Sequence, residues 1–325
     1  MCHVSSTAES GHRVSQPTCQ LWAISGSRSL RDCDEVLYAR DGFERMNVMA
    51  TIDKVTDLAA VNQTLLYYEK QGNGPALLLI AGSTGDAGNF TRAADLLADE
   101  FTVVTYDRRG NSRSPRPSGW KTTSVAEQAD DAAALIRALD LAPAAIFGAS
   151  AGGPIALDLM IRHPELVSAG VLQEPSIFSV LPDPMVAIAP RRALIEEALP
   201  LKGPRGAVEA LMRYLNDDGV FAAIPPDVLE RMLGNADTIL TIEAPGFAGW
   251  QPTAEQLAKL NVPITLIFAE RTLSVYKEVT NWLAKRLNTE PLSVPGPHGF
   301  YFYRPQVLAD VLRLTLKGSM RPDVR

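Results

Sequence analysis

The chain has 325 residues, of which 46% are apolar and 21% charged, and its formal net charge is −6. This composition is typical of a globular protein with one large domain, or a domain plus an insert. No basic tract stands out and no run approaches the ~18 apolar residues of a membrane span, so we expect neither nucleic acid nor a membrane as a partner. The beginning of the chain has no basic-then-apolar signal pattern, so we expect a cytoplasmic protein.

The first 48 residues differ from the rest of the chain. Residues 1–48 are rich in Ser, Arg, Gly and Asp and carry no sustained hydrophobic period, which predicts a disordered extension. The three cysteines, Cys2, Cys19 and Cys33, all lie in this segment. The remaining chain therefore has no thiol with which to form a disulfide or a cysteine metal site.

From residue 51 onward, short apolar strands alternate with amphipathic helices. We expect strands at 65–69, 76–81, 101–106, 144–147, 169–173, 263–269 and 290–294. We expect helices at 90–100, 124–139, 151–163, 274–287 and 305–316. This alternation predicts an α/β fold with a mostly parallel sheet covered by helices on both faces. Ligands of such sheets bind at the carboxyl ends of the strands.

The alternation stops between the strand that ends at 173 and the strand that begins at 263. Three or four helical segments punctuated by prolines fill this stretch, which predicts a helical cap at 178–252. The core then comprises 49–177 and 253–325. Apolar cap side chains favour an apolar substrate, and we expect Met185, Phe247 and Trp250 to line its pocket.

A candidate nucleophile lies between the strand 144–147 and the helix that follows. Residues 148–152 read Gly-Ala-Ser-Ala-Gly, which fits the motif G-x-S-x-G, in which the serine occupies a strained turn between strand and helix. The small neighbours let the backbone pass close to itself. Ser150 then presents its hydroxyl at a helix N-terminus, whose unpaired N–H groups suit a developing oxyanion.

A serine hydroxyl needs a base to remove its proton, and the chain has four histidines. His3 and His12 lie in the extension, and His163 ends the helix after the serine, where it most simply contacts the terminal carbonyls. His298 lies in the segment Pro-Gly-Pro-His-Gly-Phe after the last strand, in a loop able to aim a side chain over the sheet edge. We therefore expect His298 to be the base.

This order of strand, serine turn, helical insert and late histidine loop resembles the α/β-hydrolase superfamily over roughly residues 51–318. The segment 105–114, Thr-Tyr-Asp-Arg-Arg-Gly-Asn-Ser-Arg-Ser, is similar to the Y-D-x-R-G-x-G-x-S loop of that family. The resemblance implies an oxyanion hole formed by the backbone N–H groups of Ser83 and Ala151. Because position 150 is a serine rather than an aspartate, the chain does not resemble a haloalkane dehalogenase or an epoxide hydrolase.

The third member of the triad has two candidates. The family usually places its acid after the strand 264–269, where this chain has Glu270 and, at the usual aspartate position, Thr272. Some members place it one strand earlier, where this chain has Glu174. A carboxylate at either strand end could hold the histidine tautomer and stabilise its cation. We favour Glu174 and keep Glu270 as the alternative acid.

These features predict a lidded serine hydrolase that cleaves an ester or lactone in an apolar small molecule through an acyl-enzyme. Glu174 with the histidine loop and the helical lid is similar, in part, to fungal zearalenone lactone hydrolases. Two alternatives stay open: carbon–carbon bond hydrolysis or perhydrolysis on the same triad, and ligand binding with little turnover. We expect no cofactor and no metal, and a homodimer is left open.

Overall fold

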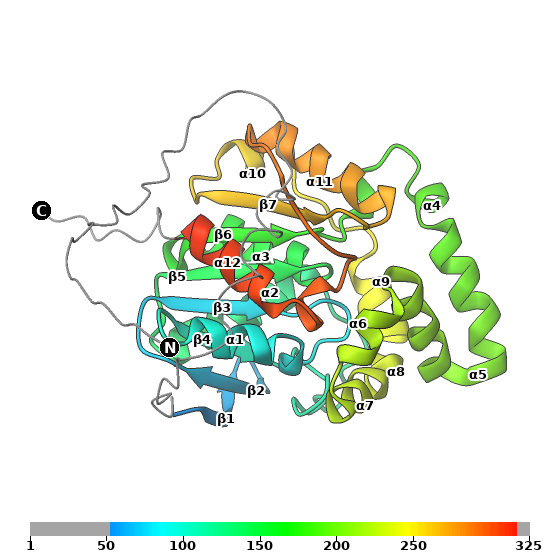
Figure 1. Cartoon of the computed structure of the whole chain (residues 1–325), viewed down its shortest axis with the longest axis horizontal. Coiled ribbons are helices and arrows are strands. Elements are labelled where there is room, and N and C mark those ends of the chain that lie inside the picture. Colours follow the sequence, from blue (N-terminus) through cyan, green and yellow to red (C-terminus); the bar gives the residue numbers. More distant parts are fainter. Residues whose placement is uncertain (1–52, 317–325) are drawn as a thin grey trace, which may run out of the picture.

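The computed structural model describes residues 53–316, so the extension predicted at 1–48 lies outside the described residues. One sheet runs through this part of the chain (Figure 1), and its strand order is β1-β2-β4-β3-β5-β6-β7-β8. The strands are β1 Val55–Val61, β2 Thr64–Gln71, β3 Ala76–Ile80, β4 Thr102–Tyr106, β5 Ala144–Ala149, β6 Val167–Gln173, β7 Ile264–Ala269 and β8 Leu292–Val294.

Most of the sheet is parallel. Strand β2 pairs antiparallel with β1 and with β4, and all the other neighbours pair in parallel. All six residues of β5 are buried, as expected for a strand covered on both faces. The predicted α/β fold with a mostly parallel sheet is therefore confirmed.

Successive strand residues enter two different cores, because side chains alternate across a sheet. In β5, Ala145 and Phe147 belong to one core with helices α1 and α12. The neighbouring Ala144 and Ile146 belong to the other core, with α2, α3 and α11. These core helices are α1 Thr91–Leu97, α2 Val125–Ala138, α3 Gly152–Arg162, α10 Ala254–Ala258, α11 Ser274–Leu287 and α12 Pro305–Leu316.

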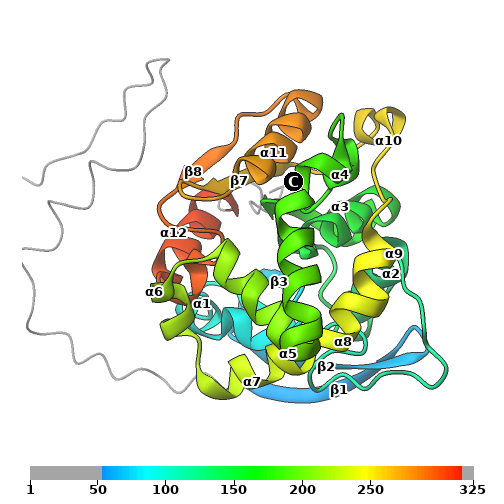
Figure 2. The ribbon, with the colours of Figure 1, turned by 90° about the vertical axis from the view of Figure 1, so that its right-hand side faces the viewer.

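The remaining helices lie between β6 and β7 in the sequence, and we call them the cap helices. They are α4 Pro184–Ala187, α5 Ala189–Leu215, α6 Asp218–Ala223, α7 Pro226–Gly234, α8 Ala236–Thr238 and α9 Ala244–Phe247. Figure 2 shows them as a green-to-yellow layer in front of the ends of the central strands. The cap helices therefore stand over the edge of the sheet at which ligands of such folds bind.

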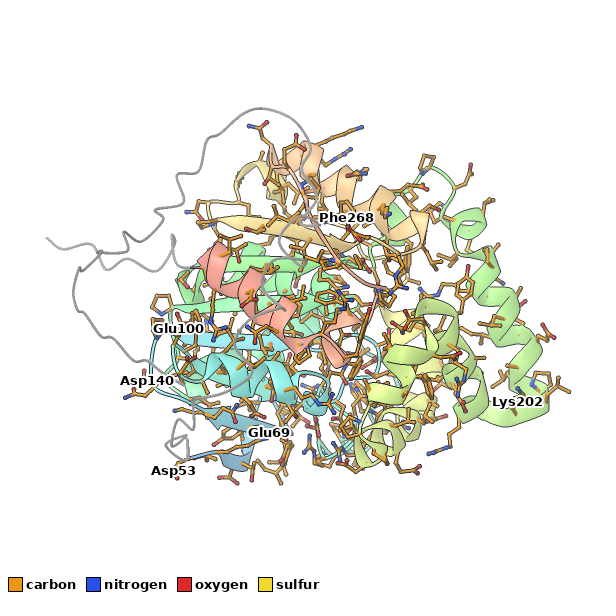
Figure 3. The ribbon with its side chains drawn as sticks, in the orientation of Figure 1. Asp53, Glu69, Glu100, Asp140, Lys202 and Phe268 are labelled. Atoms are coloured by element: carbon orange, nitrogen blue, oxygen red, sulfur yellow. The ribbon has the colours of Figure 1, made fainter. Side chains whose placement is uncertain are left out.

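The longest cap helix, α5, is two helices joined at a kink. The sequence predicts separate helices at 185–199 and 206–216, and α5 indeed consists of two helical segments that meet between the prolines at 200 and 204. The helix changes direction at Gly203, whose φ of 66° and ψ of −177° are not helical. Lys202, next to this kink, lies at the outer end of the cap (Figure 3). Proline disrupts a helix by removing an N–H donor, which agrees with the break between the two segments.

Candidate active site

Ser150 occupies a strained turn directly after β5. Its φ is 52°, in the left-handed region that a residue with a side chain seldom adopts, and only 6% of its surface is exposed. Two glycines make this turn sterically feasible. A Cβ on Gly148 would lie 2.6 Å from the carbonyl oxygen of Gly152, and a Cβ on Gly152 would collide with the backbone of Ile80.

Backbone hydrogen bonds tie this turn to the end of the neighbouring strand β6. The N–H of Ser150 donates to the carbonyl of Gln173 at 2.8 Å, and the N–H of Ser176 donates to the carbonyl of Ser150 at 3.1 Å. The two hydroxyl oxygens, Ser150 Oγ and Ser176 Oγ, are 3.1 Å apart. The serine turn and the loop after β6 therefore hold one another in place.

His298 lies in the loop after β8 and is buried, with 6% of its surface exposed. The side-chain amide of Gln173 donates to the backbone carbonyl of His298 at 3.0 Å, which anchors this loop to the end of β6. The ring Nδ1 is hydrogen-bonded to Oε2 of Glu174. His298 and Ser150 line the same cavity.

Glu174 follows β6 and is fully buried. Its backbone also adopts the left-handed region, with φ of 47°. Besides its contact with His298, the carboxylate accepts hydrogen bonds from the N–H of Ala269 at 2.6 Å and from the hydroxyl of Thr272 at 2.9 Å. A buried carboxylate that accepts several hydrogen bonds is held in one orientation.

The structure thus brings the carboxylate of Glu174 to the histidine. The backbone N–H of Glu270 donates to the carbonyl of Val294 at 2.8 Å, and its own carbonyl accepts from the ammonium of Lys277 at 2.8 Å. Thr272, at the position where the family usually has an aspartate, contributes a hydroxyl donor to the acid from the neighbouring strand.

Tyr276, in the first turn of α11, is a part of the site that sequence reasoning missed. Its ring lies against the ring of His298, with centroids 4.5 Å apart and planes inclined by 35°. Burial raises the pKa of Tyr276, and hydrogen bonds with Ser150 and Ser176 oppose this only in part. The phenol is therefore neutral at pH 7 and packs beside both the serine and the histidine.

The loop after β3 carries Ser83, which lines the cavity, and Gly82, which approaches the serine closely. A Cβ on Gly82 would lie 3.1 Å from the Cβ of Ser150. Arg108 holds this loop, since its guanidinium donates to the carbonyl of Gly82 at 2.9 Å and to that of Ser83 at 3.3 Å. Ala151, the other predicted oxyanion donor, directly follows Ser150 and precedes α3.

The same arginine connects this loop to the cap. Arg108 forms two hydrogen bonds with the carboxylate of Glu243, at 2.7 and 2.8 Å, and both side chains are buried. Glu243 also accepts from the side-chain amides of Asn111 at 2.8 Å and Gln128 at 3.1 Å. A buried, bidentate pair of this kind fixes the relative position of the two segments.

Comparison with known proteins identifies the family. The family described as "alpha/beta hydrolase fold" matches residues 75–198. The chain is 34% identical over 248 residues to "Uncharacterized hydrolase YraK" of Bacillus subtilis, an alignment that covers 74% of this chain and 89% of that protein. The chain belongs to the α/β-hydrolase family.

Solved structures of other α/β hydrolases share the fold. An esterase from Thermogutta terrifontis superposes with a TM-score of 0.65 at 22% identity, covering 84% of this chain and all of that chain. Carboxylesterase CesB from Bacillus subtilis also gives a TM-score of 0.65, at 18% identity, with 83% of this chain and 94% of that chain covered. Structural similarity at such low sequence identity shows a shared fold and does not show a shared activity.

In this α/β hydrolase, the cavity next to Ser150 measures about 60 Å³. Its apolar wall comes mainly from α5, the segment 232–239 and the histidine loop; the apolar side chains that line it are Val208, Leu211, Met212, Leu215, Met232, Ile239, Tyr301 and Phe302. The cavity is far smaller than the ~300 Å³ or more of a pocket for a drug-sized ligand.

The three side chains predicted to line the pocket lie elsewhere. Met185 is 57% exposed on α4, whereas Phe247 and Trp250 are partly buried against the core to which α2 and α3 contribute. Sequence alone places these residues in the cap, but the face that each presents depends on how the cap helices pack. The cavity uses the second half of α5 instead.

His163 lies away from this cavity. Its Nε2 is 2.8 Å from a carboxylate oxygen of Asp130, and its Nδ1 is 3.5 Å from a guanidinium nitrogen of Arg137. It therefore contacts charged side chains of α2 rather than the terminal helix carbonyls that we expected. Within residues 53–316, no helix is long and apolar enough to cross a membrane, and no group of three or more His, Cys, Asp or Glu is arranged to hold a metal ion.

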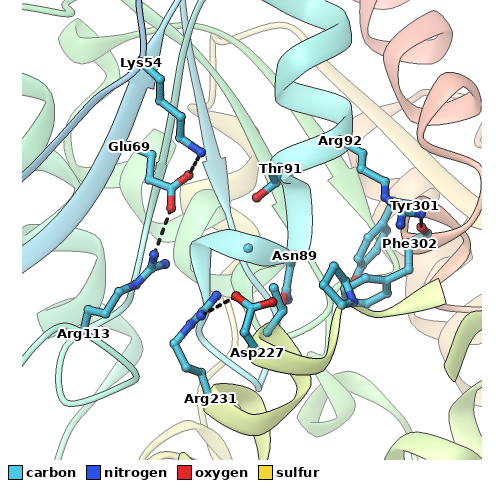
Figure 4. A pocket seen from close by; sticks show the side chains of 13 residues that line it. Lys54, Glu69, Asn89, Thr91, Arg92, Arg113, Asp227, Arg231, Tyr301 and Phe302 are labelled. Carbon is cyan, nitrogen blue, oxygen red and sulfur yellow. Dashed lines mark hydrogen bonds and ion pairs between the residues drawn. The ribbon is translucent and has the colours of Figure 1, made fainter. Parts of the chain in front are cut away.

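A second cavity, of about 340 Å³, lies near β2, α7 and the segment that precedes α1 (Figure 4). Most of its charged side chains pair with one another. Glu69 binds Lys54 and, at 3.0 Å, Arg113, while Asp227 binds Arg231 at 2.9 Å. Neither Ser150 nor His298 lines it, so the smaller cavity is the candidate active site.

Proposed function

We propose that this protein is a serine hydrolase that cleaves carboxylic esters or lactones through an acyl-enzyme. The observation that carries the proposal is the hydrogen bond between His298 Nδ1 and the buried Glu174, beside a cavity that the histidine shares with the strained Ser150. A nucleophile, a base and a group that orients the base are the three elements that acyl transfer requires.

In the proposed mechanism, Ser150 Oγ attacks the carbonyl carbon of the substrate while His298 Nε2 takes the serine proton. The resulting oxyanion is bound by the backbone N–H groups of Ser83 and Ala151. The intermediate collapses, and the C–O bond to the alcohol breaks as His298 returns the proton to it. Water, deprotonated by the same nitrogen, then releases the acid and restores the serine.

Glu174 acts on the histidine rather than on the substrate. Its carboxylate accepts the Nδ1–H, which keeps Nε2 free to take a proton, and its negative charge stabilises the imidazolium that forms. The Ser150 hydroxyl lies 3.1 Å from Ser176 in the free protein. Catalytic hydrogen bonds in free enzymes are often long and tighten when the substrate binds, so the serine can turn to His298 at that stage.

The small, largely apolar cavity supports a compact substrate over a long-chain lipid ester. We expect p-nitrophenyl acetate and butyrate to be better substrates than the octanoate, and small lactones to be accepted. A steady rise in kcat/KM with acyl length up to the octanoate would contradict this preference. Measuring kcat/KM for small lactones beside these esters then decides between a carboxylesterase and a lactonase.

A fluorophosphonate probe tests the nucleophile directly, because it reacts with activated serines. We expect the wild-type protein to be labelled at residue 150 and the Ser150→Ala variant to stay unlabelled. Ser176→Ala is the matched control, since the Ser176 hydroxyl lies 3.1 Å from that of Ser150 but belongs to the loop after β6. This variant should still be labelled at residue 150. Labelling of Ser150→Ala, or none of the wild type, would refute the proposal.

A further inference from the structure

The candidate active site contains one side chain that the proposed triad does not use. Arg191, in the first turn of α5, lines the cavity together with Ser150 and His298. Among the described residues that line this cavity, Arg191 is the one with a permanent charge. A cation in a wall that is otherwise apolar or neutral calls for an explanation, because burial of an unpaired charge is unfavourable.

Arg191 is half-buried. Among the residues that the structure describes, its guanidinium contacts the Phe178 ring and takes part in no ion pair. The next residue behaves differently. Arg192 is exposed and pairs with Glu196, one turn along the same helix, at 3.0 Å. Arg191 has Ile195 at the corresponding position, so its own helix offers it no carboxylate. The two arginines thus separate into one that faces outward with a partner and one that faces the cavity without one.

Aromatic rings hold Arg191 close to the catalytic groups. Its guanidinium carbon lies 5.1 Å from the ring centroid of Phe178, and the Phe178 ring is 5.3 Å from that of Tyr276. The Tyr276 ring lies in turn against His298. The charge of Arg191 acts on Tyr276, lowering its pKa against the larger effect of burial. The cation therefore sits within electrostatic reach of the phenol that contacts Ser150.

We infer that Arg191 binds a carboxylate carried by the substrate, so that the preferred ester or lactone bears a negative charge a few bonds from the scissile carbonyl. A guanidinium offers two parallel N–H donors that match a carboxylate, and such charge-assisted pairs are strong when partly shielded from water. The stacking on Phe178 orients the guanidinium before the substrate arrives, which reduces the entropy lost on binding. This inference rests on the proposed function, and it narrows the substrate to compact esters of dicarboxylic acids or carboxylated lactones.

The test compares two esters of equal acyl length, monoethyl glutarate and ethyl pentanoate, of which only the first carries a carboxylate. We expect the wild-type kcat/KM to favour monoethyl glutarate by roughly ten- to hundredfold, the range of a hydrogen bond to a charged group. Arg191→Met should lower kcat/KM for monoethyl glutarate at least ten times more than for ethyl pentanoate. Arg192→Met, the exposed neighbour, should leave both values unchanged.

Equal losses on both esters in Arg191→Met, or no preference for monoethyl glutarate in the wild type, would overturn the inference. Binding of glutarate itself, measured by calorimetry, gives a readout that needs no turnover. Glutarate should bind the wild type and the Arg192→Met variant, and bind Arg191→Met at least tenfold more weakly. If glutarate binds with these relative affinities while neither ester is hydrolysed, the proposed function fails and the anion site stands. If glutarate binds the wild type and both variants with equal affinity, the anion site alone is refuted.

Discussion

Replacement of Glu174 by glutamine tests the central contact of the proposed triad. The carboxylate uses Oε1 to accept from the N–H of Ala269 and Oε2 to accept from Thr272 and His298. A glutamine whose oxygen keeps the Ala269 bond must direct its NH₂ group at His298. The ring nitrogen Nδ1 then has to accept, which places the proton on Nε2, where it blocks proton transfer from Ser150.

We therefore expect Glu174→Gln to lower kcat by about 10²–10⁴, the loss associated with the wrong histidine tautomer in other serine hydrolases. The assay is hydrolysis of p-nitrophenyl acetate, with urea unfolding as the check on the fold. Glu270→Gln is the control and should lower kcat by less than about tenfold. A folded Glu174→Gln that keeps kcat within tenfold of the wild type, or a larger loss in Glu270→Gln, would refute the assignment.

A double variant sharpens this test. Thr272 already donates to the Glu174 carboxylate at 2.9 Å, so a carboxylate at position 272 would start close to the same histidine. Thr272→Asp combined with Glu174→Gln should regain at least about tenfold of the lost kcat, because it restores a charge on the far side of the imidazole. Failure of this rescue, with the double variant folded, would show that only the β6 position reaches the ring productively.

Three further predictions concern the serine, its neighbour and the connection to the cap. Ser150→Ala should lower kcat by about 10⁴–10⁶ with an unchanged melting temperature, measured after exclusion of contaminating esterases; residual activity within tenfold would contradict its role. Gly82→Ala adds a Cβ 3.1 Å from the Cβ of Ser150, and this displacement should lower kcat roughly tenfold while the protein stays folded; an unchanged rate would mean that the serine position tolerates the shift. Glu243→Ala leaves Arg108 buried without its partner and should reduce the free energy of unfolding in urea by about 3–5 kcal/mol. Its control, Glu255→Ala, removes only an exposed pair and should change stability little; equal effects would argue against the buried pair.

Much of the core could be predicted from the sequence because its strands are buried on both faces. An unbroken apolar run such as 76–81 is the signature of such a strand, and β3 occupies 76–80. Helices α11 and α12 have the bounds expected from the sequence. At the edge of the sheet the predicted bounds are less accurate, because only local sequence patterns act there. The edge strand β8 begins at Leu292, two residues later than expected.

The cap could not be predicted in the same detail. Its helices pack on the core through faces that the hydrophobic pattern alone does not identify, so the side chains that line the cavity next to Ser150 are not the three expected. Tyr276 and Arg191 gave no sequence signal, since one tyrosine and one arginine on helices are most simply read as packing and surface residues. Each acquires its role from residues distant in the sequence, such as His298 and Phe178, that only the fold brings together.

The choice between the two acids depends on neighbouring strands rather than on local sequence. Strand β6 lies between β5, which ends at the serine turn, and β7, after which Glu270 follows. Adjacent strands are about 4.8 Å apart, so a side chain at the end of β6 can contact groups at both neighbouring strand ends. Glu174 does so: its backbone N–H donates to the carbonyl of Ile267 at 3.1 Å and its carboxylate binds Ala269, both in β7.

The two left-handed residues of the site follow from the same arrangement. Ser150 and Glu174 come directly at the ends of adjacent parallel strands, and each adopts a φ near 50°. Such conformations cost of order 1–3 kcal/mol each and persist only where surrounding contacts outweigh that cost. Here the contacts are mutual, since the Ser150 N–H donates to Gln173 and the Ser176 N–H donates back to Ser150. The strained turns therefore stabilise one another, and they can do so only because β5 and β6 are neighbours in the sheet.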